Sequence, residues 1–166
     1  MHTFLLAPTG FGVGLTSVSL GMVQVLKNAG LRVGFLKPIA QPHPSESGAE
    51  RVSQLMAGLY GTSQPTCLTL GHVERMVGNG QMDDLMEEIV SMHQQMSDQY
   101  DIIIVEGMTP SRQAQYVERI NASLAKTLDA EVILVSAQQS EDLDEISDRI
   151  ESQAQLFGGT SNPTVL

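Results

Sequence analysis

The chain has 166 residues, of which 42% are hydrophobic and 4% aromatic, so we expect one compact domain with an aliphatic core. Its formal net charge of −10 argues against nucleic acid or an anionic membrane as the main partner. The single cysteine, Cys67, excludes an intramolecular disulfide, and the first residues contain neither a basic segment nor a long apolar run. We therefore expect a cytoplasmic protein in which Cys67 has a small, buried, apolar role.

Four short apolar runs predict strands that are covered on both faces, because their residues are apolar almost throughout instead of alternating. In chain order these runs are "TFLLA" at 3–7, "RVGFLK" at 32–37, "DIIIVEG" at 101–107 and "EVILVSA" at 131–137. Residues 164–166 have the pattern of a further strand that has just begun. We therefore expect a domain that is truncated at its carboxyl end.

Apolar residues at helical spacing predict helices between these strands. The helices are expected at 16–29, 81–97, 113–128 and 141–156, with a further one near 48–59. The methionine stripe of the second helix is expected to face the core, whereas the four histidines, including His93, are assigned to the surface. Strands that alternate with helices predict an α/β fold with a mostly parallel central sheet.

The stretch "APTGFGVGLTS" at 7–17 lies between the first predicted strand and the first predicted helix. Its three glycines, Gly10, Gly12 and Gly14, permit tight turns. The backbone N–H groups of such a loop, together with the positive end of the helix, form a cradle for an anion. The position of the loop therefore indicates a candidate ligand site.

The loop lacks one charge that a phosphate-binding loop of the Walker type carries. Such a loop ends Gly-Lys-Ser/Thr, whereas this one ends Gly14-Leu15-Thr16. Because the lysine stabilises charge on the transferring phosphoryl group, its absence disfavours phosphoryl transfer. Two alternatives stay open: the loop binds a nucleotide or another anion without turnover, or it is a packing turn that binds nothing.

Two charged residues end predicted strands, where ligands of parallel sheets are found. Lys37 could supply the charge that Leu15 lacks, or it could simply extend from the strand end into water. Glu106 stands where a magnesium ligand or a water-orienting carboxylate would be placed. Thr16 could join it on a metal, or could cap the helix together with Ser17. We expect Lys37 and Glu106 at the rim of the site and assign no metal.

Several motifs together resemble the amino-terminal domain of the long bacterial phosphate acetyltransferases. They are "PTGFGVGLTSVSLG", "FLKPIAQP", "LMEEIV", "VEGMTPSRQAQ" and "NASLAKTLDAEVILVSAQ", in this order along nearly the whole chain. That domain is in turn similar to dethiobiotin synthetase, a P-loop-type α/β enzyme. The resemblance implies a single domain over 1–166 with a three-layer, P-loop NTPase-like fold.

The resemblance also implies a function. The complete protein would interconvert acetyl-CoA and phosphate with acetyl phosphate and CoA, using a carboxy-terminal catalytic domain that this chain lacks. The amino-terminal domain is associated in the family with regulation by metabolites and with oligomer stability, so we expect it to be inactive alone. Its partners would be the remaining domains and further copies of the same protein, with no nucleic acid and no membrane.

Site residues follow from the resemblance position by position. The loop of the synthetase is matched by Val13, Gly14 and Thr16 but not by Leu15, and its strand-end lysine and glutamate are matched by Lys37 and Glu106. The ligand-binding set is Thr9, Gly10, Gly12, Val13, Gly14, Thr16 and Ser17. No cofactor is required, and the expected effector is ATP, NADH or a small anionic metabolite. The rival readings are an active ATP-dependent ligase and a purely structural docking domain.

Overall fold

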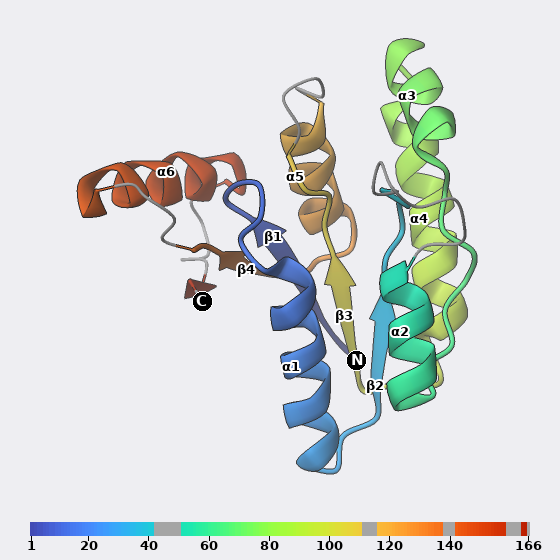
Figure 1. Cartoon of the computed structure of the whole chain (residues 1–166). Coiled ribbons are helices and arrows are strands. Elements are labelled where there is room, and N and C mark those ends of the chain that lie inside the picture. The colour runs from blue at the N-terminus through green and yellow to red at the C-terminus, as the bar shows by residue number, and fades with distance from the viewer. Residues whose placement is uncertain (42–50, 111–115, 138–141, 159–163, 166) are drawn as a thin grey trace.

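The computed structural model describes residues 1–41, 51–110, 116–137, 142–158 and 164–165. Within these residues a five-stranded sheet has the order β2-β3-β1-β4-β5, and all of its strand pairs are parallel (Figure 1). The strands are β1 (His2–Pro8), β2 (Val33–Leu36), β3 (Ile102–Glu106), β4 (Glu131–Val135) and β5 (Thr164–Val165). The predicted parallel sheet is confirmed, and the strand pattern at the carboxyl end corresponds to β5.

Helices cover both faces of this sheet and complete three layers (Figure 1). They are α1 (Leu15–Asn28), α2 (Arg51–Tyr60), α3 (Leu70–Gly78), α4 (Met82–Ser97), α5 (Val117–Thr127) and α6 (Leu143–Leu156). All the predicted helices are present, although 48–50, 113–115 and residue 141 of their predicted ranges lie outside the described residues. The three-layer α/β architecture is confirmed.

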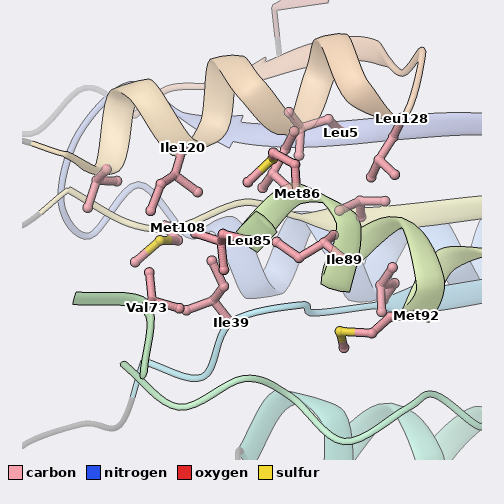
Figure 2. Packing of buried hydrophobic residues seen from close by; sticks show 14 of the residues in the cluster. Leu5, Ile39, Val73, Leu85, Met86, Ile89, Met92, Met108, Ile120 and Leu128 are labelled. Carbon is pink, nitrogen blue, oxygen red and sulfur yellow. The ribbon is translucent and has the colours of Figure 1, made fainter. Parts of the chain in front are cut away.

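Alternate residues of the central strands β1 and β3 belong to hydrophobic clusters on opposite faces of the sheet. Leu5 of β1 belongs to a cluster with α3, α4 and α5, which we call the α4–α5 cluster, and its neighbour Leu6 belongs to a cluster with α1 and α2, which we call the α1 cluster. Figure 2 shows the first of these, in which Leu85, Met86 and Ile89 of α4 pack together with Leu5. The methionine stripe faces this core, as predicted.

Helix α3 is the element that the sequence pattern did not predict. It begins after Thr69, whose side chain caps the helix by accepting a hydrogen bond from the His72 N–H at 3.3 Å. Glycine is unfavourable within a helix, and this short helix contains Gly71 and Gly78. Packing of Val73 against the α4–α5 cluster overrides the weak local preference.

The surface assignment of His93 is wrong. The side chain is buried between α4 and the sheet, and its Nε2 lies 3.0 Å from the hydroxyl oxygen of Thr3 in β1. Cys67 also differs from its expected apolar role, because it is half-buried and its Sγ accepts a hydrogen bond from Nε2 of Gln64 at 3.2 Å. Both residues lie where the fold supplies polar partners that no local pattern reveals.

Burial lowers the pKa of His93 below its ordinary value of 6.5. The folded chain therefore holds fewer protons at this ring than the unfolded chain, so stability falls as the pH drops through that ordinary value. We expect the thermal midpoint of the wild type to decrease between about pH 7.5 and about pH 5.5 more steeply than that of His93→Gln. The exposed His2→Gln variant is the control, and equal slopes for the wild type and His93→Gln would contradict the prediction.

No helix in the described part of the chain is both long enough and apolar enough to span a membrane.

Candidate functional site

The glycine-rich loop connects the carboxyl end of β1 to the start of α1. Two hydrogen bonds hold the start of the loop against the end of β4. The Thr9 N–H donates to the Val135 carbonyl at 2.9 Å, and the Thr9 hydroxyl donates to Oγ of Ser136 at 3.0 Å. Gly12 and Gly14 adopt positive φ angles of 69° and 79°, which residues with a side chain rarely adopt. The loop is thus a defined structure between the ends of β1 and β4.

The strand order places this loop at a change of direction in the sheet. β1 lies between β3 and β4, and the chain leaves it through α1 toward β2, on the far side of β3. The later strands β4 and β5 lie on the opposite side of β1. Ligands of open α/β sheets bind at the carboxyl edge where such a change occurs. The fold therefore places the loop where a ligand site is expected.

Gly14, rather than Thr16 or Ser17, caps α1. Its left-handed conformation starts the helix at Leu15, and no side chain caps the helix N-terminus. Thr16 and Ser17 lie within the first turn, so the expectation that they cap the helix is wrong. The first turn also carries no acidic residue. Side chains of the first turn itself therefore do not neutralise the positive end of the helix dipole.

Leu15 contributes to the core at the position where a Walker loop has its lysine. The side chain is 7% exposed and packs in the α1 cluster, which also contains Val13 and Val23. The position has therefore exchanged a cation that contacts phosphate for an aliphatic group that stabilises the fold.

Restoring the lysine is expected to destabilise the protein. Leu15→Lys would bring an ammonium group into the α1 cluster and beside the positive end of α1, so we expect a loss of about 2–4 kcal/mol in the free energy of unfolding. Leu15→Met, which conserves volume, should cost less than about 1.5 kcal/mol. Urea unfolding measures both variants. A Leu15→Lys variant that is as stable as Leu15→Met would show that the position tolerates a cation.

Lys37 and Glu106 form a buried ion pair on the α1 side of the sheet. Nζ of Lys37 donates to Oε1 of Glu106 at 2.8 Å, and the two residues are 7% and 2% exposed. The hydroxyl of Ser19 in α1 donates to Oε2 of the same carboxylate at 2.8 Å and to the Leu15 carbonyl at 3.0 Å. Lys37 and Glu106, which we expected at the rim of the site, are therefore buried and paired with each other.

The segment that follows β2 holds Lys37 in place. The backbone N–H of Lys37 donates to Oε1 of Gln64 at 2.8 Å, and the Leu68 N–H donates to the Pro38 carbonyl at 2.8 Å. Sequence reasoning missed both Gln64 and Ser19. Ser19 did leave a signal, because it is the polar member of a buried stripe in which Leu15 and Val23 lie four residues to either side.

The described residues do not favour a magnesium site at Glu106. Both of its carboxylate oxygens already accept hydrogen bonds, one from Lys37 and one from Ser19. In the described part of the chain, no three His, Cys, Asp or Glu side chains are grouped as metal ligands would be.

Comparison with known proteins defines the class first. The model of a family described as an AAA domain matches residues 2–155, so the chain belongs to that family. The P-loop NTPase-like fold agrees with this: the signal recognition particle 54 kDa protein of Aeropyrum pernix, solved in complex with GDP, superposes with a TM-score of 0.59. That match covers 95% of this chain and 32% of the other at 17% identity, and it shows the fold alone.

Within this class, the chain is similar to bacterial phosphate acetyltransferases. It is 59% identical to that of Pseudomonas aeruginosa and 58% identical to that of Pseudomonas putida, in both cases over all 166 residues. The chain spans about a quarter of the length of these relatives, 24% in each case. The resemblance to the amino-terminal domain of long phosphate acetyltransferases, drawn above from the sequence motifs, is confirmed.

Proposed function

We propose that this chain is the regulatory domain of a phosphate acetyltransferase and that it binds a nucleotide or a small anionic metabolite without transforming it. The complete protein would interconvert acetyl-CoA and phosphate with acetyl phosphate and CoA in the cytoplasm, through domains outside this chain. The observation that carries the proposal is Leu15. The loop keeps its glycines and the uncapped start of α1, which favour an anion, but the lysine position belongs to the core.

The interior pair also favours binding over catalysis. The charges of Lys37 and Glu106 compensate each other at 2.8 Å. A lysine held in this way is a poor candidate for stabilising charge on a transferring phosphoryl group, and an ATP-dependent ligase would need that charge. ATP, NADH and pyruvate are the effectors that we propose to test, with the loop residues as their contacts.

Calorimetric titration of the 166-residue chain with ATP, NADH and pyruvate tests the proposal. We expect at least one of them to bind, and we expect no steady ATP turnover. Lack of binding by all three at millimolar concentration would refute sensing. ATP turnover that disappears in Glu106→Gln would instead establish the ligase.

Support of an oligomer is a second role that can coexist with sensing. Leu55 and Leu59 are one helical turn apart on α2, so they share a face, and both are exposed. A further domain or a second copy of the protein would cover this face. Comparing the assembly size of the full-length protein with that of a form lacking residues 1–166 tests this role, which equal sizes would refute.

A further inference from the structure

The guanidinium of Arg149 in α6 lies beside the glycine-rich loop. A Cβ atom added to Gly10 would be 3.9 Å from Nη1 of Arg149. Nη2 donates to Oγ of Ser136 and to the Ala137 carbonyl, at 3.4 Å in both cases. Figure 1 shows α6 next to the loop that joins β1 to α1. A cation and the hydroxyls of Thr9 and Ser136 thus meet at the carboxyl ends of β1 and β4.

Arg149 is exceptional within its helix. It is the only basic residue of 142–158, a segment with five acidic residues that are all exposed: Asp142, Asp144, Glu145, Asp148 and Glu151. Arg149 is instead half-buried, and it belongs to the stripe of α6 that also contains Ile146 and Ile150 and faces the sheet. Its side chain is therefore directed away from the acidic surface and toward the strand ends.

We propose that Arg149 replaces the missing loop lysine and that, together with the loop, it binds the phosphate groups of an anionic ligand. This inference rests on the ligand-binding function proposed above and names the ligand class, a phosphate-bearing anion. Lys37 cannot readily take this part because it is buried against Glu106. The planar guanidinium can donate two parallel hydrogen bonds to a phosphate, a geometry that a lysine ammonium group does not offer.

The position of Arg149 also separates binding from hydrolysis. The cation of a Walker loop follows directly from the loop and moves with α1, whereas Arg149 is carried by α6 on the other face of the sheet. A bound phosphate would therefore connect the two faces, from α1 to α6. The ligand would act as a link between helices rather than as a reactant.

Titration of the 166-residue chain with ATP, inorganic pyrophosphate, adenosine and pyruvate tests this assignment. We expect ATP and pyrophosphate to bind and adenosine not to bind. Arg149→Met should weaken both phosphate ligands by about tenfold or more, and Arg149→Lys should recover part of that loss. The control is Lys126→Met, which removes the same charge from an exposed position in the last turn of α5 and should leave binding unchanged.

The outcomes distinguish this inference from the proposed function. Binding of ATP or pyrophosphate that Arg149→Met leaves unchanged would overturn the role of Arg149 but not ligand sensing. Binding of pyruvate alone, or of adenosine as tightly as ATP, would overturn the phosphate class. A wild type that binds nothing would overturn both. Thermal midpoints of all variants, measured without ligand, separate lost binding from lost folding, because a purely structural arginine would lower the midpoint without selecting phosphate over adenosine.

Discussion

Replacing Lys37 with methionine is expected to lower the free energy of unfolding by about 3–5 kcal/mol at neutral pH. The variant would remove the ammonium donor of Lys37 from the carboxylate of Glu106, which is 2% exposed, and would keep the hydroxyl donor of Ser19. A buried charge that loses its counter-charge keeps its full cost of desolvation. Urea unfolding followed by circular dichroism measures the loss.

The same two strands provide a matched control at their other end. Arg32 and Asp101 pair just before β2 and β3 begin, but both side chains are exposed. Arg32→Met should therefore change stability little, because water solvates the remaining charge. The double variant Lys37→Met/Glu106→Gln should recover a large part of the loss, since it no longer buries a charge. Equal effects of Arg32→Met and Lys37→Met would show that burial is not what makes the interior pair matter.

Asn121→Ala is expected to cost about 2–5 kcal/mol, because it leaves two buried backbone groups without partners. Oδ1 of Asn121 accepts from the Met108 N–H at 2.8 Å, and its Nδ2 donates to the Met108 carbonyl at 2.9 Å. Met108 is 2% exposed, so water cannot readily replace the amide. The contact is tight, since a Cβ atom at Gly107 would lie 2.9 Å from Oδ1 of Asn121. Asn121 thereby holds the chain directly after Glu106.

The side-chain amide of Gln41 makes the same pair of hydrogen bonds at a position that is more exposed to solvent. Gln41 accepts from the Thr109 N–H at 2.7 Å and donates to the Thr109 carbonyl at 3.0 Å, but both residues are half-buried. Gln41→Ala should therefore cost about 1 kcal/mol or less, because solvent can satisfy the freed groups. Differential scanning calorimetry of the two variants tests the comparison. A loss in Asn121→Ala no larger than that in Gln41→Ala would contradict the role of burial.

Sequence patterns predicted the sheet because its strands are continuous apolar runs, and that signal does not depend on distant contacts. They failed at α3, where two glycines weaken the helical pattern, and at His93, whose partner Thr3 is 90 positions away in the sequence. Whether a polar residue on a core-facing stripe is buried cannot be decided from the sequence until the element that packs against it is known. Burial of His93 is therefore a tertiary effect.

Only some residues of the candidate site could be predicted from the sequence, and their arrangement could not. The glycines, Leu15 and the two strand-end charges could be read from the sequence. The pairing of Lys37 with Glu106 could not, because the two residues are 69 positions apart in the sequence. They meet only because β2 and β3 are neighbours in the folded sheet, with Leu36 in register with Val105. Arg149 was missed for the same reason, since the arrival of α6 at the loop is a product of chain topology.

Burial of Leu15 has an evolutionary consequence. A descendant that regained lysine at this position would gain nothing until neighbouring side chains had been reshaped to let the ammonium group turn outward. Variants with lysine at position 15 but without those compensating changes would be less stable and would not yet bind phosphate through the lysine. A buried leucine at this position thus makes a return to lysine costly, which is consistent with the binding role proposed above.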